Sequence, residues 1–295
     1  MLKRTITGAV YVAIIIGFFL LRDYVDYRLF DLLIFAFCAI GTFEIARAIK
    51  PYIYKGNFTL AVCFGVAFTP IFCAAEYLTG FGGAFVCLVL SLVAVAYQVV
   101  LAAVKEKNVN GANFKKTARA FAVNALPFVY PALFLLTVLI SNGFAGIKGF
   151  VCLLLIFVIP PCSDTFAYLV GMSYGKIRKG KAKKLCPRLS PNKTWAGAIG
   201  GILGGVLGAL VLYFIVDTAA LSQDAKVDPF IVFMLVGLLA SVLTEIGDLF
   251  ESFIKRKVGI KDMGRIMPGH GGVMDRIDGT LFAAVFIFLA FLLLT

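Results

Sequence analysis

The chain has 295 residues, of which 61% are hydrophobic and only 15% charged, and its formal net charge is +12. Its mean hydropathy is +0.97. So few polar side chains cannot cover the surface of a soluble protein of this size, which excludes a soluble enzyme, a secreted domain and a disordered tail. The composition predicts an all-α, polytopic integral membrane protein. Six of the seven cysteines lie in or beside apolar segments, so no disulfide framework is expected.

Nine apolar segments are long enough to cross a membrane, since a spanning helix needs about 20 mostly apolar residues. They are residues 5–21, 29–49, 59–78, 83–104, 120–140, 149–171, 195–216, 229–250 and 277–295. We divide the chain into an N-terminal region, 1–148, with the first five helices, and a catalytic region, 149–295, with the other four and two cytoplasmic motif loops.

The basic residues alternate between the joints that connect these segments. Of the 28 lysines and arginines, 24 fall on one side of the predicted membrane. Because basic residues favour the cytoplasmic side, we place the N-terminus and the five basic segments in the cytoplasm. This asymmetry accounts for most of the net charge, so we expect no nucleic-acid partner.

Six acidic residues fall in or at the ends of the apolar spans, where an ionisable group costs at least about 2.5 kcal/mol at the bilayer centre. They are Asp31, Glu44, Glu76, Asp164, Glu245 and Asp248. We interpret Asp31, Glu44 and Glu76 as structural, and Glu44 is three residues before Arg47, with which it can pair. The other three are candidates for function.

A polar stripe runs along the end of the eighth predicted helix. Glu245, Asp248 and Ser252 are spaced i, i+3, i+7, which places them on one helical face that leads to Lys255 and Arg256. Charged side chains at this depth predict a functional site rather than a solvated surface.

The next joint contains Pro-Gly-His-Gly-Gly at 268–272, which cannot form a regular helix and allows backbone N–H groups to approach a ligand closely. Asp275 and Asp278 then share a face at the start of the last helix. Helix capping explains either aspartate singly, but not the acidic stripe one loop away. Carboxylates without a Cys/His cluster favour a hard cation such as Mg²⁺. His270, the only histidine, suits acid–base chemistry or the orientation of phosphate or of the loop.

A second group of polar residues lies in the second half of the sixth predicted helix and in the loop that follows it. Asp164, Tyr168 and Gly171 share a helical face at i, i+4, i+7, and Pro160-Pro161 is expected to kink or break the helix. We interpret 176–188 as a basic loop that attracts anionic lipid without specificity.

The start of the seventh helix follows that loop. Ser190 can cap it, and Lys193 can act as a point charge for phosphate. Glycines at 197, 200, 201, 204, 205 and 208 then form a small-residue face, suited to helix packing or to a dimer contact.

These residues resemble the phosphatidate cytidylyltransferase (CDP-diacylglycerol synthase) family. Its signature is S-x-x-K-R, four residues, K-D, then P-G-H-G-G, a spacer and D-R-x-D. In this chain the first part is matched by Ser252, Lys255-Arg256 and Lys261-Asp262. The second part is matched by 268–272, Asp275-Arg276 and Asp278. A second family motif, D-x-x-A-Y-x-x-G followed by G-K and S-P-N-K-T, is matched by Asp164, Ala167-Tyr168, Gly171, Gly175-Lys176 and 190–194. The first 150 residues match only in having apolar spans. Gly279 departs from the family, which often has serine there.

The resemblance implies the reaction CTP + phosphatidic acid → CDP-diacylglycerol + pyrophosphate, in phospholipid biosynthesis. It implies Mg²⁺, with a second cation possible, held by Asp248, Asp275 and Asp278. The implied catalytic residues are these three with Lys255, Arg256 and His270. The implied substrate-binding residues are Asp164, Tyr168, Lys176, Ser190, Asn192, Lys193, Thr194, Ser252, Lys261, Gly269, Gly271, Gly272 and Arg276.

The resemblance further implies a multi-pass protein of the cell inner (plasma) membrane with its active site facing the cytoplasm, and it allows a homodimer.

Two other functions stay open. A CTP-dependent polyprenol kinase-like enzyme would use a similar nucleotide site with another acceptor. A secondary transporter would also have intramembrane acids and Pro/Gly-broken helices, but its hallmark is an internal repeat, and no convincing repeat is present.

Overall fold

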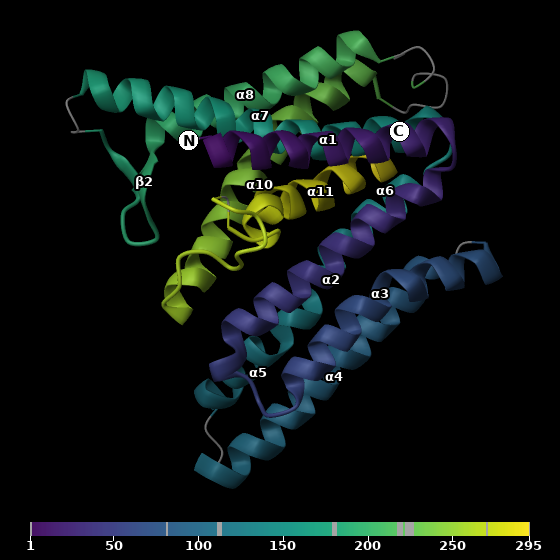
Figure 1. The fold of residues 1–295 in the computed structure, drawn as a ribbon, viewed down its shortest axis with the longest axis vertical. Coiled ribbons are helices and arrows are strands. Elements are labelled where there is room, and N and C mark those ends of the chain that lie inside the picture. The colour runs from purple at the N-terminus through teal and green to yellow at the C-terminus, as the bar shows by residue number, and fades with distance from the viewer. Residues whose placement is uncertain are drawn as a thin grey trace. The chain divides into compact units, whose positions relative to one another are not determined.

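The structure is a computed structural model that describes residues 2–80, 82–110, 114–178, 182–216, 221, 227–269 and 271–294. Helices dominate these residues (Figure 1). The main elements are α1 (Leu2–Tyr24), α2 (Phe30–Ile49), α3 (Asn57–Thr79), α4 (Gly83–Asn110), α5 (Phe114–Val129), α6 (Ala132–Asn142), α7 (Ile147–Ile177), β1 (Lys184–Cys186), β2 (Ser190–Thr194), α8 (Trp195–Ile215), α10 (Pro229–Val258) and α11 (Met274–Leu294). Short 3₁₀ turns η1 (Tyr27–Leu29) and η2 (Lys50–Tyr52) flank α2.

Within the described residues, nine helical segments are long and apolar enough to cross a membrane. This confirms the predicted all-α, multi-pass membrane fold. The fifth segment, Lys115–Asn142, consists of two helices rather than one, because α5 ends at Val129 and α6 begins at Ala132. Pro131 lies between them, and a proline has no backbone N–H with which to continue a helix.

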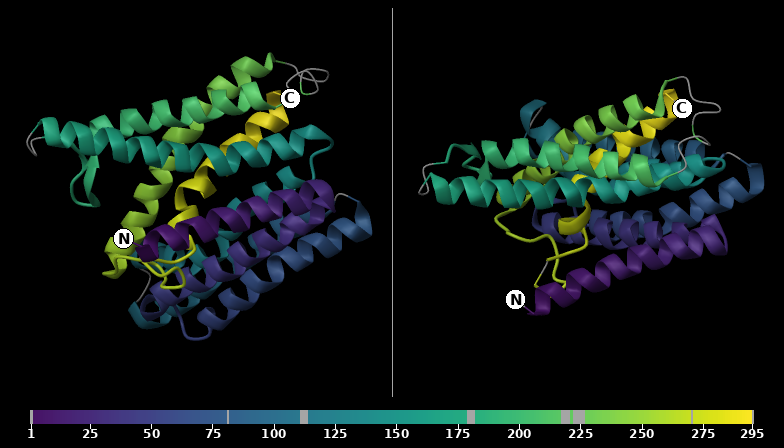
Figure 2. Two further views of the ribbon diagram at one scale, coloured as in Figure 1. Left: turned by 45° about the horizontal axis from the view of Figure 1, so that its top comes forward. Right: turned by 90° about the horizontal axis from the view of Figure 1, so that it is seen from above.

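Pro160 and Pro161 were expected to kink or break a helix, and the break does not occur, because α7 is one helix of 31 residues with both prolines inside it (Figure 2). The kink stays a prediction. Two missing N–H donors are tolerated in a helix whose neighbours pack closely against it. The hydroxyl of Thr165 donates to the carbonyl of Pro161 at 2.7 Å, an additional hydrogen bond within this stretch of the helix.

The chain forms two compact units. Unit 1 contains residues 1–139 and 262–275, and unit 2 contains residues 140–261 and 276–295. The predicted division after residue 148 stays a prediction.

A buried amide network joins three helices of unit 1. The side-chain amide of Asn57 on α3 donates to Gln98 on α4 at 2.8 Å and to Asn124 on α5 at 2.7 Å. All three side chains are buried. Polar groups away from water need such partners, so the network specifies how these helices pack.

In unit 2, the glycine face of α8 packs against its neighbours in the same chain. A Cβ added at Gly200 would lie 2.6 Å from Val170 Cβ, and one at Gly208 would lie 3.1 Å from Cys162 Sγ, both on α7. Gly237 of α10 likewise has no room for a Cβ beside Val206 of α8. The packing interpretation of these glycines is confirmed, and the face no longer supports a homodimer.

We expect Gly200→Ala to lower the free energy of unfolding by about 1–3 kcal/mol, because the added methyl overlaps Val170. Thermal unfolding of the detergent-purified protein measures the change. Gly17→Ala in α1 is the matched control, since nothing lies within 4 Å of its added Cβ, and a helical Gly→Ala change in open space is neutral or stabilising. Equal melting temperatures for both variants would contradict the packing argument.

Candidate active site

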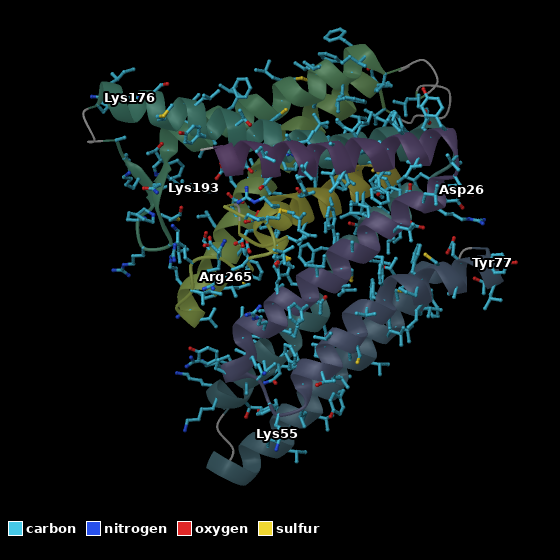
Figure 3. The ribbon with its side chains drawn as sticks, in the orientation of Figure 1. Asp26, Lys55, Tyr77, Lys176, Lys193 and Arg265 are labelled. Atoms are coloured by element: carbon cyan, nitrogen blue, oxygen red, sulfur yellow. The ribbon has the colours of Figure 1, made fainter. Side chains whose placement is uncertain are left out.

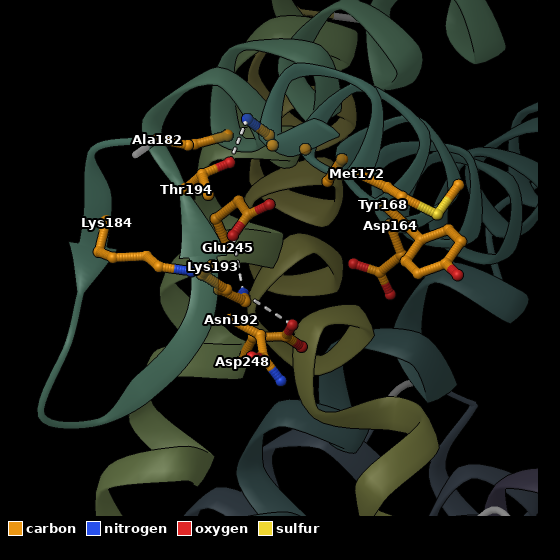
Figure 4. Close-up of a pocket in the computed structure, with 15 residues that line it drawn as sticks. Asp164, Tyr168, Met172, Ala182, Lys184, Asn192, Lys193, Thr194, Glu245 and Asp248 are labelled. Atoms are coloured by element: carbon orange, nitrogen blue, oxygen red, sulfur yellow. Dashed lines mark hydrogen bonds and ion pairs between the residues drawn. The ribbon is translucent and has the colours of Figure 1, made fainter. Parts of the chain in front are cut away.

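A pocket of about 460 Å³ lies inside unit 2, between α7, the β1–β2 hairpin, α8 and α10 (Figure 4). It is lined by Asp164, Ala167, Tyr168, Gly171, Met172, Gly175, Ala182, Lys184, Asn192, Lys193, Thr194, Gly197, Ala198, Glu245 and Asp248. Six of the predicted site residues are among them: Asp164, Tyr168, Asn192, Lys193, Thr194 and Asp248. The fold therefore brings together motif segments that are far apart in the sequence.

Lys193 bridges two carboxylates in this pocket. Its ammonium lies 2.7 Å from Glu245 Oε2 and 2.8 Å from Asp248 Oδ2, and all three side chains are largely buried (Figure 4). Burial opposes the charge on Lys193, but the carboxylates of Asp248 and Glu245 outweigh it and raise the pKa of Lys193 above its ordinary value. The bridge therefore contributes fully to stability below the ordinary lysine pKa of about 10.4 and is lost only as pH rises through the higher folded-state value.

Asp164 and Tyr168 form the α7 wall of the pocket, as their shared helical face predicts (Figure 4). On the same stretch α7 and α8 cross closely at two glycines. A Cβ added at Gly197 would lie 2.9 Å from the Ala167 carbonyl oxygen, and one at Gly171 would lie 3.5 Å from Gly197 Cα. Gly197 thus has no room for a side chain, which allows the two walls to meet, and a Cβ at Gly171 would lie 3.3 Å from Thr194 Oγ1.

The hairpin was not predicted, because 176–188 was interpreted as a loop. β1 and β2 pair antiparallel, with Lys184 opposite Thr194 and Cys186 opposite Ser190. Lys184 lines the pocket, and the sequence analysis missed it. The signal that could have found it is its place in a strand opposite the S-P-N-K-T motif, which only the pairing register shows.

The predicted cap at Ser190 was wrong. Ser190 begins β2, and the N-cap of α8 is Thr194, whose hydroxyl accepts a hydrogen bond from Gly197 N at 3.1 Å. Because α8 begins at Trp195, only a residue directly before it can bond the N–H groups of its first turn. Thr194 thereby fixes the strand that carries Asn192 and Lys193 to the helix.

α10 and α11 cross closely beside the pocket. A Cβ added at Gly247 would lie 2.6 Å from the Asp278 carbonyl oxygen, and one at Gly279 would lie 2.7 Å from Thr244 Cγ2. Gly279, which departs from the family's serine, therefore occupies a position with little room for a side chain. The crossing places Asp278 near Asp248.

A second carboxylate cluster lies one turn beyond Asp248. Glu251 is fully buried, lies near Asp278 and is ion-paired with Lys255 at 3.3 Å. Lys255 thus balances a buried carboxylate in this structure. Glu251 was not among the predicted site residues, although its i, i+4 spacing to Lys255 was a usable signal.

Arg256 holds the end of α10 and the hairpin turn. Its guanidinium donates to the carbonyl oxygens of Leu189, at 3.4 Å, and Ile260, at 3.2 Å. The predicted phosphate role of Arg256 stays a prediction, and the contacts seen here order the chain around the pocket.

Other predicted residues of unit 2 are not among those that line the pocket: Lys176, Ser190, Ser252, Lys255, Arg256, Lys261, Arg276 and Asp278. Lys176, for example, lies near the end of α7 (Figure 3). Their predicted roles stay predictions.

The glycine-rich loop belongs to unit 1 and is not helical, as predicted. Gly269 and Gly271 have φ of +78° and +89°, a region that favours glycine, and Met267 and Gly271 exchange two backbone hydrogen bonds of 2.9 and 3.1 Å. Arg265 lies in the same segment (Figure 3). His270 lies outside the described residues.

Asp275, at the start of α11, closes this loop. Its carboxylate accepts hydrogen bonds from the backbone N–H groups of Gly272, at 2.7 Å, and Met263, at 2.9 Å. The predicted metal and catalytic roles of Asp275 stay predictions, and the hydrogen bonds show that it also shapes the loop.

The donor chemistry of the pocket fits a hard cation. Asp164 and Asp248 offer only oxygen, the ligand type that Mg²⁺ prefers. Among the described residues no three His, Cys, Asp or Glu side chains are gathered closely enough to hold a metal ion. The cation that lies between Glu245 and Asp248 in this structure is the ammonium of Lys193.

The fold and this pocket define a multi-pass membrane protein with a charged, glycine-walled cavity. The family model described as "Cytidylyltransferase family" matches residues 2–294. The chain therefore belongs to the cytidylyltransferase family, as its motifs predicted, and this membership leaves no support for the transporter alternative.

Curated relatives named phosphatidate cytidylyltransferase are similar to parts of the chain. The Brucella abortus protein is 42% identical over 141 residues, 48% of this chain and 47% of its own length. The Thermotoga maritima protein is 35% identical over 179 residues, 61% of each chain. The Bacillus subtilis protein is 38% identical over 126 residues, 43% of this chain and 42% of its own length. The chain thus spans about half the length of most of the curated relatives it matches.

Proposed function

We propose that this protein is a phosphatidate cytidylyltransferase, which converts CTP and phosphatidic acid into CDP-diacylglycerol and pyrophosphate. The observation that carries the proposal is the convergence of Asp164, Lys193 and Asp248 on one pocket. Asp164 and Lys193 belong to the second family motif, and Asp248 lies four residues before the signature that begins at Ser252. Relatives that carry the same name support the choice of reaction.

In this reaction an oxygen of the lipid phosphate attacks the α-phosphorus of CTP, and the bond to the β-phosphate breaks. The attacking phosphate is already anionic, so the protein need not supply a serine, cysteine or histidine nucleophile. It must bring two anions together, align them and stabilise the pyrophosphate that leaves.

The basic side chains around the pocket suit this task. Lys193 and Lys184 line it, and both can offset phosphate charge as point charges. We assign Lys255, Arg256 and Arg276 supporting roles in charge neutralisation, and the loop amides at Gly269, Gly271 and Gly272 a role at the triphosphate. We assign the remaining predicted residues, Lys176, Ser190, Ser252 and Lys261, to substrate binding as the motifs imply.

We also propose Mg²⁺ as the cofactor, with a second cation possible. Asp248 and Asp278 of unit 2 would take part in holding it, with Asp164 nearby, and the metal role of Asp275 is proposed from the motif alone. When bound, the cation would neutralise charge on the triphosphate and on the leaving pyrophosphate. His270 would orient phosphate or transfer a proton.

The proposed location is the inner (plasma) membrane, with the active site facing the cytoplasm. The 24 basic residues on one side of the predicted topology support it. CTP would enter from the cytoplasm, and the lipid would enter sideways from the inner leaflet.

The test is conversion of radiolabelled CTP and phosphatidic acid by the detergent-purified protein, with Mg²⁺ and with EDTA. We expect equal amounts of CDP-diacylglycerol and pyrophosphate, formed only with the divalent cation. If folded protein yields neither product with several phosphatidic acids, the assigned acceptor is wrong. Polyprenols would then be tested with the same nucleotide, as for a polyprenol kinase-like enzyme.

A further inference from the structure

The loop of residues 262–273 contacts a helix that carries none of the family motifs. Glu44 lies in α2 and is 2% exposed. Its carboxylate accepts hydrogen bonds from Val273 N at 3.2 Å and from Met274 N at 2.9 Å. The sequence predicted a structural role for Glu44 through a pairing with Arg47, whereas these hydrogen bonds give it a structural role at Val273 and Met274.

Glu44 meets the start of α11. The first N–H groups of a helix have no partner within it, and the helix dipole favours negative charge at that end. A buried carboxylate that accepts two such N–H groups forms charge-assisted hydrogen bonds, which are roughly twice as strong as neutral ones. Glu44 therefore holds the exact place where the loop becomes helix.

Two glycines of the loop leave room for this carboxylate. A Cβ built on Gly264 or on Gly272 would overlap the Glu44 carboxyl group. The loop thus closes around the end of the Glu44 side chain, and the overlap gives a packing reason for glycine at both positions.

The same loop is held from its other side by Asp275. The carboxylate of Asp275 bonds Gly272 N and Met263 N, while Glu44 bonds the two residues that come between Gly272 and Asp275 in the chain. A change at Glu44 therefore alters the backbone that directly precedes Asp275.

We propose that Glu44 is a positioning residue, through which the N-terminal helices hold the glycine-rich loop and the start of α11 in their working geometry. Glu44 acts through the loop and touches no reacting atom. The activity readout of this proposal rests on the proposed function, but the structural readout does not.

The experiment compares Glu44→Gln, Glu44→Ala and Glu76→Gln in the full-length, detergent-purified protein. Glu76 is the matched control, because its carboxylate also bonds the N–H of a helix start, Gly83 at 2.9 Å, in another part of unit 1. Hydrogen–deuterium exchange of peptides that cover residues 263–276 reports the loop, and kcat and KM for CTP report the reaction.

We expect the hydrogen–deuterium exchange rate of this loop to rise at least about tenfold in Glu44→Gln, because an amide replaces a charge-assisted acceptor. In Glu44→Ala the exchange rate should rise further. In both variants kcat should fall at least about tenfold, and KM for CTP should rise, because the loop amides are assigned to the triphosphate. Glu76→Gln should leave the exchange of this loop and kcat unchanged.

Three results would overturn the proposal. Loop exchange and kcat could stay at the wild-type values in Glu44→Gln, or kcat could fall without any local change in exchange. Exchange could also rise equally in Glu76→Gln, which would show only a general loss of stability. If Glu44→Ala does not fold, Glu44→Gln, which has nearly the same shape, still decides. If the wild-type protein converts no phosphatidic acid, the proposed function fails, and the exchange result alone decides whether Glu44 positions the loop.

Discussion

Asp248→Asn is expected to lower kcat at least about 100-fold while the protein still inserts and folds. The substitution keeps the shape of the side chain but removes a carboxylate from the pocket, where it lies 2.8 Å from the Lys193 ammonium. In the proposed reaction this carboxylate also holds the divalent cation, so its loss removes charge stabilisation where the triphosphate is bound. Asp275→Asn is expected to lose activity as well.

Asp228→Asn is the matched control, because it makes the same substitution on the same helix. Asp228 caps the other end of α10 by accepting a hydrogen bond from Phe230 N at 2.7 Å. Asparagine caps helices about as well as aspartate, so folding and turnover should stay the same. CTP turnover by the detergent-solubilised protein measures activity, and its thermal unfolding measures folding. Near-normal turnover in folded Asp248→Asn would contradict the proposed metal and catalytic role.

Lys193→Met is expected to lower both stability and activity, and a second substitution should separate the two effects. Without the ammonium, the carboxylates of Glu245 and Asp248 lose their shared partner in a largely buried pocket. We expect a loss of about 2 kcal/mol in the free energy of unfolding, less than for a fully buried pair because the site is partly exposed. Activity should fall at least about 100-fold, since a phosphate-binding charge is removed.

The double variant Lys193→Met, Glu245→Gln should recover most of the stability, because it removes one of the two unpaired charges, but none of the activity. Thermal unfolding and CTP turnover are measured on both variants. Lys148→Met is the control, because it makes the same substitution near the N-terminal end of α7, outside the residues that line the pocket. It should resemble the wild type. Recovery of turnover together with stability would mean that Lys193 serves only the fold.

The membrane spans were predictable because the length of an apolar segment is a local property of the sequence. Eight of the nine predicted spans correspond to single described helices. The remaining span, 120–140, is the fifth along the chain, and it differs only in being divided at Pro131. The absence of a break at Pro160 and Pro161 has a physical cause. Whether a helix survives two missing donors depends on the helices packed against it, which the local sequence does not reveal.

The site was predictable in its residue types but not in its contacts. Helical spacing placed Asp164, Tyr168 and Gly171 on one face, and all three line the pocket. The same spacing could not show that Lys193 joins Glu245 and Asp248, because these residues are about fifty positions apart and meet only when α8 packs against α10.

The sequence by itself therefore determined the membrane fold, the family and the carboxylates and basic residues that the proposed chemistry needs. Only the tertiary structure decided which charges are paired with one another, that Lys193 lies in a β-hairpin, and that Glu44 of α2 holds the start of α11. The reason is that hydrophobic periodicity and motif spacing record local order along the chain, whereas ion pairs and loop contacts between distant segments depend on how the helices pack.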